Sequence, residues 1–444
     1  MYFIGIDIGT SSICGVVYHT STQNVISITR ENCATIPSSK SWEKKQDADT
    51  IINIVINIVR EFQSQYKEIK GIGITGQMHG IVYTDVQGNA VSPLYTWQDG
   101  RGNLDYKENQ NYAAYLRDIT DYPVATGYGL VTHFYNIQNR LIPANATKLC
   151  TIMDYAVMKL SGKNTPQIDP TNAASLGFFD KKELVFNMEA IQKAGIDTAM
   201  VPEVVPSASL AGYYHKIPVY TAIGDNQASF LGSVRDINHS IHITVGTSSQ
   251  VSIYTDRYME INSLDTRPLP GGGYLLVGAA LCGGYSFAIL RKFFNSTLHL
   301  FTGKELSKND LYTIMTSISY QKDSKNDLII DTLFDGTRSS PDERGKITNI
   351  STSNLTPENL IIGFVKGISQ GLYNYFQLLP ESLKKNKTIL VGSGNGIKKN
   401  SLLHEALEDR FDRPMQLSTI QEEAAFGACL CCMGEGHYSR QFIY

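Results

Sequence analysis

Two aspartates stand where apolar runs give way to polar loops. Asp7 lies in the run Tyr2-Phe-Ile-Gly-Ile-Asp-Ile-Gly9, just before a turn that reads Gly9-Thr-Ser-Ser12. Asp225 follows the apolar run Val219 to Ile223 and opens a helix-like segment. A carboxylate beside N–H groups and hydroxyls can hold Mg²⁺ near phosphates, and a carboxylate at a strand end can accept a proton. Each also has a plainer interpretation, because Asp often caps turns and helices.

The turn after Asp7 has a second copy. Ile4-Gly-Ile-Asp-Ile-Gly-Thr-Ser-Ser12 is echoed by Ile241-His-Ile-Thr-Val-Gly-Thr-Ser-Ser249, and each copy reads as a strand, a turn and another strand. We expect a duplicated domain with its boundary near residues 232 to 240, the alternative being two unrelated hairpins. Thr244 stands where the first copy has Asp7, so the two copies should not do the same job. Two such turns could grip a triphosphate.

Two nucleotide motifs are ruled out. No G-x-x-x-x-G-K-[ST] exists, so the turns are not Walker A loops. Gly71-Ile-Gly-Ile-Thr-Gly76 matches G-x-G-x-x-G, but residues 77–85 read as another strand where the dinucleotide motif needs a helix. His79 and Trp97, taken singly, are compatible with ordinary core packing.

The bulk composition limits the class of protein. A chain of 444 residues suggests two domains, and 42% apolar with 18% charged residues is typical of a globular protein. A net charge of -3 gives no footprint for nucleic acid or membrane. The seven cysteines show no C-x-x-C pair with His partners, which argues against zinc and for buried thiols in a reducing compartment. Without a signal-like start or an apolar span, we expect a cytoplasmic protein.

The pattern of elements indicates α/β layers. Strands are expected at residues 2–8, 12–18, 25–29, 69–75 and 219–223, and a helix over Asp49 to Phe62 with one apolar face. Further helices are expected at Glu358 to Leu379, Asn400 to Phe411 and Glu422 to Met433. The alternation of strands and helices favours a sheet covered by helices.

An ordered set of motifs resembles the FGGY carbohydrate kinases of the actin-like ATPase superfold. The motifs run from one end of the chain to the other: Asp7-Ile-Gly-Thr-Ser-Ser12, Gly76-Gln-Met-His-Gly80, Thr96-Trp-Gln-Asp-Gly-Arg101, Ile168-Asp-Pro-Thr-Asn-Ala-Ala-Ser175, Gly224-Asp-Asn-Gln-Ala228, Gly246-Thr-Ser248, Gly278 to Arg291, Val391-Gly-Ser-Gly-Asn-Gly396 and Glu422-Glu-Ala-Ala-Phe-Gly-Ala428. Within the family the chain is most similar to the sedoheptulokinase branch, through Val124-Ala-Thr-Gly-Tyr-Gly129 among others. Xylulokinases share Gln-Met-His-Gly.

The resemblance implies a fold. Two duplicated actin-like (ribonuclease H-like) domains, residues 1–235 and 236–444, would enclose a cleft that holds ATP. The first would carry the sugar site, the first phosphate turn and the base, and the second would bind the nucleotide.

The resemblance also implies residue roles. Asp225 would be the catalytic base and Asp7 the Mg²⁺ residue. The sugar would contact Gln77, Met78, His79, Asp99 and Asp225. The nucleotide would contact Gly9, Thr10, Ser11, Ser12, Gly246, Thr247, Ser248, Gly284, Gly394 and Asn395. ATP and a small sugar are the expected partners, with no nucleic acid or membrane, and the oligomeric state is left open, a homodimer included.

The expected activity is phosphorylation of the terminal hydroxyl of a ketose, sedoheptulose before others. A xylulose, ribulose or glycerol kinase is the alternative within the family. A non-catalytic sugar sensor on the same fold is a second alternative, and the intact Asp7 and Asp225 argue against it. A chaperone-type ATPase is a third alternative. Such a protein would not need Gln77 to Gly80, and it would need a further peptide-binding domain, for which no sequence remains.

Overall fold

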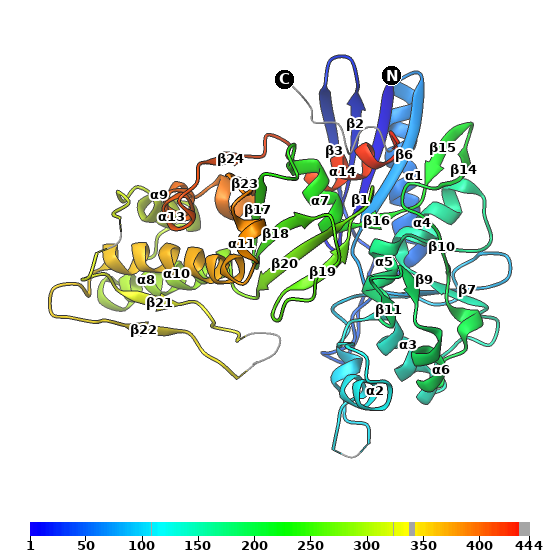
Figure 1. Ribbon diagram of the computed structural model, residues 1–444, viewed down its shortest axis with the longest axis horizontal. Helices are drawn as coiled ribbons and strands as arrows, with labels where there is room; N and C mark the ends of the chain where they lie inside the picture. Colours follow the sequence, from blue (N-terminus) through cyan, green and yellow to red (C-terminus); the bar gives the residue numbers. More distant parts are fainter. Residues whose placement is uncertain (108, 323, 337–341, 435–444) are drawn as a thin grey trace. The chain divides into compact units, whose positions relative to one another are not determined.

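The computed structural model describes residues 1–107, 109–322, 324–336 and 342–434 (Figure 1). The chain forms two compact units. Unit 1 comprises Met1–Arg235, Arg267–Gly273 and the segment from Ile420 onward, and unit 2 comprises Asp236–Thr266 and Tyr274–Thr419. The two units differ from a division at a single boundary after residue 235, which the family resemblance implied, because the chain returns to unit 1 twice. The last ten residues of the second expected domain lie outside the described residues.

Unit 1 is built on a mixed sheet. Its order is β14-β15-β6-β1-β2-β3, and β16 also pairs with β6. β1 is antiparallel to β2 and parallel to β6, as expected of a hairpin followed by a crossover helix. The strands are β1 (Tyr2–Ile8), β2 (Ser12–His19), β3 (Asn24–Glu31), β6 (Ile69–Gly76), β14 (Leu210–Tyr214), β15 (Ile217–Tyr220) and β16 (Ile223–Gly224).

Unit 2 repeats this arrangement. The order of its main sheet is β19-β20-β18-β17-β23-β24. β17 forms a hairpin with β18 and pairs in parallel with β23, just as β1 does with β2 and β6. The shared topology confirms the predicted duplication. The strands are β17 (Ser240–Val245), β18 (Ser249–Thr255), β19 (Asp265–Pro268, whose last two residues belong to unit 1), β20 (Tyr274–Ala280), β23 (Ile389–Ser393) and β24 (Met415–Leu417).

Helices pack against both sheets and beside them. α1 (Ala48–Gln65) begins at Asp47, whose side chain accepts a hydrogen bond from the Thr50 N–H, and its predicted apolar face is buried. In unit 1 the others are α2 (Tyr112–Thr120), α3 (Gly129–Gln138), α4 (Ile152–Ser161), α5 (Pro170–Leu176), α6 (Met188–Lys193), α7 (Asp225–Ser233) and α14 (Glu423–Cys431). In unit 2 they are α8 (Gly284–Thr302), α9 (Lys308–Thr316), α10 (Pro357–Gln377), α11 (Glu381–Lys384), α12 (Asn395–Lys398) and α13 (Ser401–Phe411).

Short strands and 3₁₀ turns complete the two units. In unit 1, β4 (Thr35–Ile36), β5 (Lys45–Gln46) and β8 (Leu94–Tyr95) form a three-stranded sheet. The remaining elements are β7 (Val82–Thr84), β9 (Lys148–Cys150), β10 (Gln167–Ile168), β11 (Phe179–Asp180), β12 (Val185–Phe186), β13 (Glu203–Val204), η1 (Gly100–Asn103) and η2 (Thr198–Met200), and in unit 2 β21 (Ile329–Asp331) and β22 (Lys346–Thr348).

Two expected strands were wrong in detail. Residues 77–81 form a loop, and only β7 within the 77–85 segment is a strand. The expected strand 219–223 is split between β15 and β16, so that only its last residue runs into the site. No helix follows β6, which supports the rejection of the dinucleotide motif.

Glycines let α14 lie directly on the sheet of unit 1. A Cβ atom at Gly5 of β1 would collide with the Ala425 carbonyl oxygen, and one at Gly73 of β6 with that of Ala428. The other face of α14 packs on helix α7, where a Cβ atom at Gly427 of α14 would collide with the carbonyl oxygen of Ala228 in α7. Backbone atoms cannot move aside as a flexible side chain can. The contact therefore requires glycine.

We predict that Gly427→Ala destabilises unit 1 by about 1–3 kcal/mol or more, because it overpacks this contact. Gly371→Ala in α10 is the matched control, since no atom lies within 4 Å of the added Cβ. That substitution should raise stability by roughly 0.5–1 kcal/mol, the usual gain of Ala over Gly within a helix. Urea unfolding of both variants measures the difference, and an equal response would contradict the packing argument.

Candidate active site

The register of β6 brings the two predicted aspartates to the same edge of the sheet. β6 lies between β1 and β16, and its Thr75 is aligned with Asp7 on one side and with Ile223 on the other. The Thr75 hydroxyl donates to the Ile223 carbonyl at 2.8 Å. Asp225 follows β16 as the first residue of α7. Asp7 and Asp225 thus stand at the carboxyl ends of parallel strands, where α/β proteins place their sites.

Hydrogen bonds from Asn32 and Gln46 to its carbonyl groups hold the Gly9–Ser12 turn in place. The Asn32 side chain donates to the Gly9 carbonyl at 2.8 Å, and the Asn32 N–H donates to that of Ser11 at 3.0 Å. The Gln46 side chain donates to the Thr10 carbonyl at 2.8 Å. In a trans peptide the C=O and the next N–H point in opposite directions. The N–H groups of residues 10–12 therefore point away from these donors, as in an anion-binding nest.

The corresponding turn in unit 2 is held in a similar way. Gly284 N–H, at the start of α8, donates to the Gly246 carbonyl at 2.9 Å, and Gly283 N–H donates to that of Thr247 at 2.9 Å. The turn is exposed. Gly394 abuts Val245, the residue before the turn, with φ at +83°, a conformation that favours glycine. The structure thus brings Gly246 to Ser248, Gly284, Gly394 and Asn395 together.

In the second copy Thr244 takes the position of Asp7, and its hydroxyl belongs to a small cluster of uncharged groups. Its hydroxyl lies 2.9 Å from the Ser393 hydroxyl, and His242 Nε2 lies 2.9 Å from the same oxygen. Burial lowers the pKa of His242 to about 4, so this cluster is neutral. The two copies therefore differ in charge as the sequence predicted.

The Gln77–Gly80 loop follows β6 directly. Met78 is buried, with its methyl group against Gly224 just before Asp225. His79 adopts φ of +73°, and α5 holds it there: its N–H donates to the Ser175 hydroxyl, and its Nδ1 donates to the Ser175 carbonyl at 2.7 Å. The ring stacks on Tyr128. In a neutral ring with Nδ1 protonated, Nε2 is an acceptor.

The structure encloses Asp99, which the family resemblance implied as a sugar contact. The residue is completely buried, and its two oxygens accept bonds from the Lys44 N–H and from Arg101, through the Arg101 backbone and guanidinium. Arg101 is itself buried, over the ring of Tyr95 at 4.2 Å. An ion pair this enclosed has no lone pair to offer a ligand. We reassign Asp99 to holding the loop that carries Trp97.

The charges around Asp7 and Asp225 repel one another. Burial, followed by the charges of Asp225 and Glu422, raises the pKa of Asp7 to about 7. Burial also raises the pKa of Asp225 to about 6, although the Arg267 guanidinium and the first N–H groups of α7 favour its charged form. Glu422 and Arg267 were not predicted as site residues. Arg267 belongs to no motif, and it reaches unit 1 only because β19 returns there.

These donors fit a magnesium ion held with phosphates. Mg²⁺ is usually bound through one or two carboxylates, waters and phosphate oxygens. Asp7 supplies such an oxygen next to the turn, and a cation would favour its charged form, which burial and then the nearby carboxylates disfavour. Among the described residues no group of three or more His, Cys, Asp or Glu side chains could hold a metal by itself.

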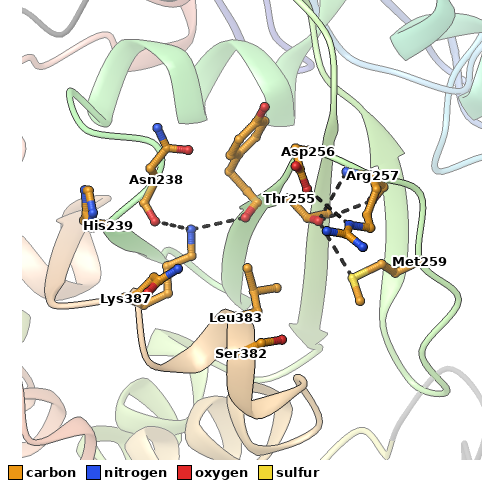
Figure 2. Close-up of a pocket in the computed structure, with 11 residues that line it drawn as sticks. Asn238, His239, Thr255, Asp256, Arg257, Met259, Ser382, Leu383 and Lys387 are labelled. Atoms are coloured by element: carbon orange, nitrogen blue, oxygen red, sulfur yellow. Dashed lines mark hydrogen bonds and ion pairs between the residues drawn. The ribbon is translucent and has the colours of Figure 1, made fainter.

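A separate cavity of about 630 Å³ in unit 2 contains none of the predicted residues (Figure 2). At its wall Lys387, which is buried, donates to the carbonyls of Ile237, Asn238 and Tyr254 at 3.2, 2.6 and 3.2 Å. Burial lowers the pKa of Lys387 to about 8. All three ammonium protons are used within the protein, so Lys387 is a structural residue.

A family comparison decides the class of protein. Residues 2–232 match the model of the N-terminal domain of the FGGY family of carbohydrate kinases. The chain belongs to this family. It is a carbohydrate kinase, a phosphotransferase whose acceptor is a sugar. The kinase is 28% identical to sedoheptulokinase of Mus musculus over 96% of both chains, and 24% identical to xylulose kinase of Staphylococcus xylosus over 98% of this chain and 91% of the relative.

Solved structures show the same two-domain, actin-like fold. The kinase matches ligand-bound xylulose kinase from Lactobacillus acidophilus with a TM-score of 0.81 at 19% identity, covering 97% of this chain and 88% of that one. It matches xylulose kinase from Rhodospirillum rubrum with a TM-score of 0.81 at 18% identity, covering 99% and 92%. Of the helices that the structure describes, none combines the length and apolarity needed to cross a membrane.

We predict that Asp7→Asn stabilises the kinase in the absence of metal and nucleotide. The folded state raises the pKa of Asp7 from 3.8 to about 7, so ionising it costs folding free energy. The resulting loss in the free energy of unfolding grows as the pH rises from about 4 to about 7 and is complete above pH 7. Asparagine avoids it, and the melting temperature should rise by about 2–4 °C at pH 8, the shift that ~1 kcal/mol produces.

At pH 5 the same substitution should have a smaller effect, because Asp7 is then protonated in the folded kinase. The control is Asp256→Asn, whose side chain is 76% exposed. Melting curves at pH 5 and pH 8 measure both variants. A gain for Asp7→Asn that does not depend on pH would contradict the electrostatic origin.

Proposed function

We propose that this kinase transfers the γ-phosphate of ATP to the terminal hydroxyl of a ketose, and that sedoheptulose is the preferred acceptor, giving sedoheptulose 7-phosphate. The observation that carries the proposal is the placement of Asp7 and Asp225 at the ends of two strands that flank β6, beside a turn whose N–H groups point away from the donors that hold its carbonyls. The similarity to sedoheptulokinases along nearly the whole chain supports the choice of sugar. Xylulose, ribulose or another polyol is the alternative acceptor.

Asp225 acts as the base. Its carboxylate accepts a hydrogen bond from the attacking hydroxyl and takes the proton as the new O–P bond forms and the bond to the ADP oxygen breaks. A pKa of about 6 keeps Asp225 ionised at neutral pH and makes it a better base than an ordinary carboxylate. Arg267 preserves the charged form by opposing the effect of burial.

Asp7 and the Gly9–Ser12 turn receive the phosphates. Asp7 would hold Mg²⁺, which when bound offsets the negative charge of the phosphate oxygens. The N–H groups of the turn donate to those oxygens. In unit 2 the Gly246–Ser248 turn, Gly284, Gly394 and Asn395 serve the nucleotide.

The sugar lies against Met78 and His79. Met78 provides an apolar wall next to Gly224, and His79 presents its ring edge from a position fixed by Ser175 and Tyr128. Gln77 is buried and bonded to its neighbours, so it shapes the loop. Asp99 stays outside this set.

We predict that Asp225→Ala lowers kcat by about 10²–10⁴-fold, the range for loss of a general base. In the parent kinase kcat/KM should rise with pH through about 6 as Asp225 ionises, and this limb should disappear in the variant. A coupled assay of ADP release from pH 5 to 8 measures both. Near-normal turnover in a folded variant would remove Asp225 from the mechanism.

We predict that sedoheptulose gives the highest kcat/KM in a panel with D-xylulose, D-ribulose, L-ribulose and glycerol, all assayed with Mg²⁺ and ATP. A sugar that leaves one buried polar group of the site unpaired should lose about ten- to a hundredfold, equivalent to ~1–3 kcal/mol. Omission of Mg²⁺ should abolish turnover. If glycerol ranks first, the proposed contacts at Met78 and His79 are wrong; if D-xylulose does, only the choice of ketose is wrong.

A further inference from the structure

A closed ring of side-chain hydrogen bonds in unit 1 joins the Gly9–Ser12 turn, called here the phosphate turn, to the Gln77–Gly80 loop, called the sugar loop. Gln46 Nε2 donates to the Thr10 carbonyl at 2.8 Å, and Gln77 Nε2 donates to Gln46 Oε1 at 2.8 Å. The Thr10 hydroxyl donates to Gln77 Oε1 at 3.3 Å, which closes the ring. Trp97 Nε1 donates to the same hydroxyl at 3.0 Å. The ring therefore contacts three of the motifs that carry the family resemblance.

Gln46 is the member of the ring that belongs to none of those motifs. Only 2% of it is exposed, and it ends β5, where it is aligned with Leu94 of β8. Two residues after Leu94, the Thr96 N–H donates to the Lys44 carbonyl at 3.0 Å. The small sheet thus fixes Gln46 relative to Trp97. A buried amide with both ends bonded has one orientation, because rotating it would leave two polar groups unpaired.

Each end of the Gln46 amide acts on a different substrate site. Its nitrogen holds the Thr10 carbonyl, which directs the Ser11 N–H toward the phosphate side of the turn. Its oxygen holds Gln77, the residue next to Met78. A shift of the sugar loop therefore changes the position of one phosphate-binding N–H through a single rigid amide.

We propose that Gln46 is a positioning residue that couples the two sites, so that bound sugar tightens the binding of ATP and bound ATP tightens the binding of sugar. The inference rests on the proposed function. The two effects must be equal in size, because coupling between binding sites is reciprocal.

Asn32 offers a matched comparison within the same turn. Its amide nitrogen holds the Gly9 carbonyl, as Gln46 holds that of Thr10. Its side-chain oxygen, however, accepts from the Ala34 N–H. Loss of Asn32 should loosen the phosphate turn and leave the connection to the sugar loop in place.

The experiment measures the Kd of a non-hydrolysable ATP analogue with Mg²⁺ by calorimetry, with and without the sugar that ranks first in the panel. In the parent kinase the sugar should tighten binding at least about fivefold, the lower end of typical coupling. In Gln46→Met, which keeps the side-chain volume, this ratio should fall to about one. In Asn32→Leu the Kd should weaken under both conditions and the ratio should persist.

Gln46→Glu is the second variant. It keeps the acceptor for Gln77 but places an oxygen against the Thr10 carbonyl, so the ratio should fall here too. A parent ratio of one, or an unchanged ratio in the Gln46 variants, overturns the coupling. Failure of the parent to phosphorylate any sugar in the panel overturns the proposed function itself, a result that the turnover assay reports separately.

Discussion

Strand β6 sets the geometry on which the site depends. It pairs in parallel with β1 and with β16, and Thr75 is aligned with a neighbour on each side. The spacing between adjacent strands is fixed by backbone hydrogen bonds. The separation of the two carboxylates is therefore set by the sheet and not by loops. The Gln77–Gly80 loop leaves the same strand, with the Gln77 N–H bonded to the Ile8 carbonyl, so the proposed acceptor site would share that geometry.

The placement of Asp7 and Asp225 at the edge of the sheet lowers the stability of the folded kinase. Burial, and then the charges of Asp225 and Glu422, raise the pKa of Asp7, and burial raises the pKa of Asp225, so the folded kinase carries that cost at neutral pH. Neighbouring contacts offset it in part through Arg267 and the N-terminus of α7. Sites that must attract a cation and a proton commonly accumulate such a cost. The second copy, with Thr244 and a neutral histidine, does not.

The sequence predicted the hairpins, the duplication and the two aspartates, because these depend on local pattern. A strand followed by a turn that contains glycine can be identified from about ten residues of sequence. An aspartate at the end of such a strand can be identified from the same residues, without knowledge of what it contacts. The burial of Asp99 was not foreseen although its partner, Arg101, lies only two residues away. The motif gave the residue types, but burial decides whether a carboxylate faces a ligand or an arginine.

Other parts of the site depend on contacts between distant segments. Gln46 and Arg267 lie outside every motif and meet the site only through β5 and β19, so no local signal marks them. The break between β15 and β16 has no strong sequence marker either. The return of α14 to unit 1 depends on glycines in β1, β6 and α7 that accept its backbone. Such pairs can be recognised only when both surfaces are known.

The close packing of α14 on β1 also has a consequence for biosynthesis. Unit 1 cannot complete its sheet surface until α14 leaves the ribosome, and 187 residues, most of them of unit 2, separate Arg235 from Glu423. At about 5–20 residues per second this interval lasts roughly 10–40 s. During it the apolar face formed by Val16 and Tyr18, which α14 covers through Ala425 and Cys429, stays open. The order of synthesis therefore leaves this part of the unit 1 surface uncovered until almost the whole described chain has been made.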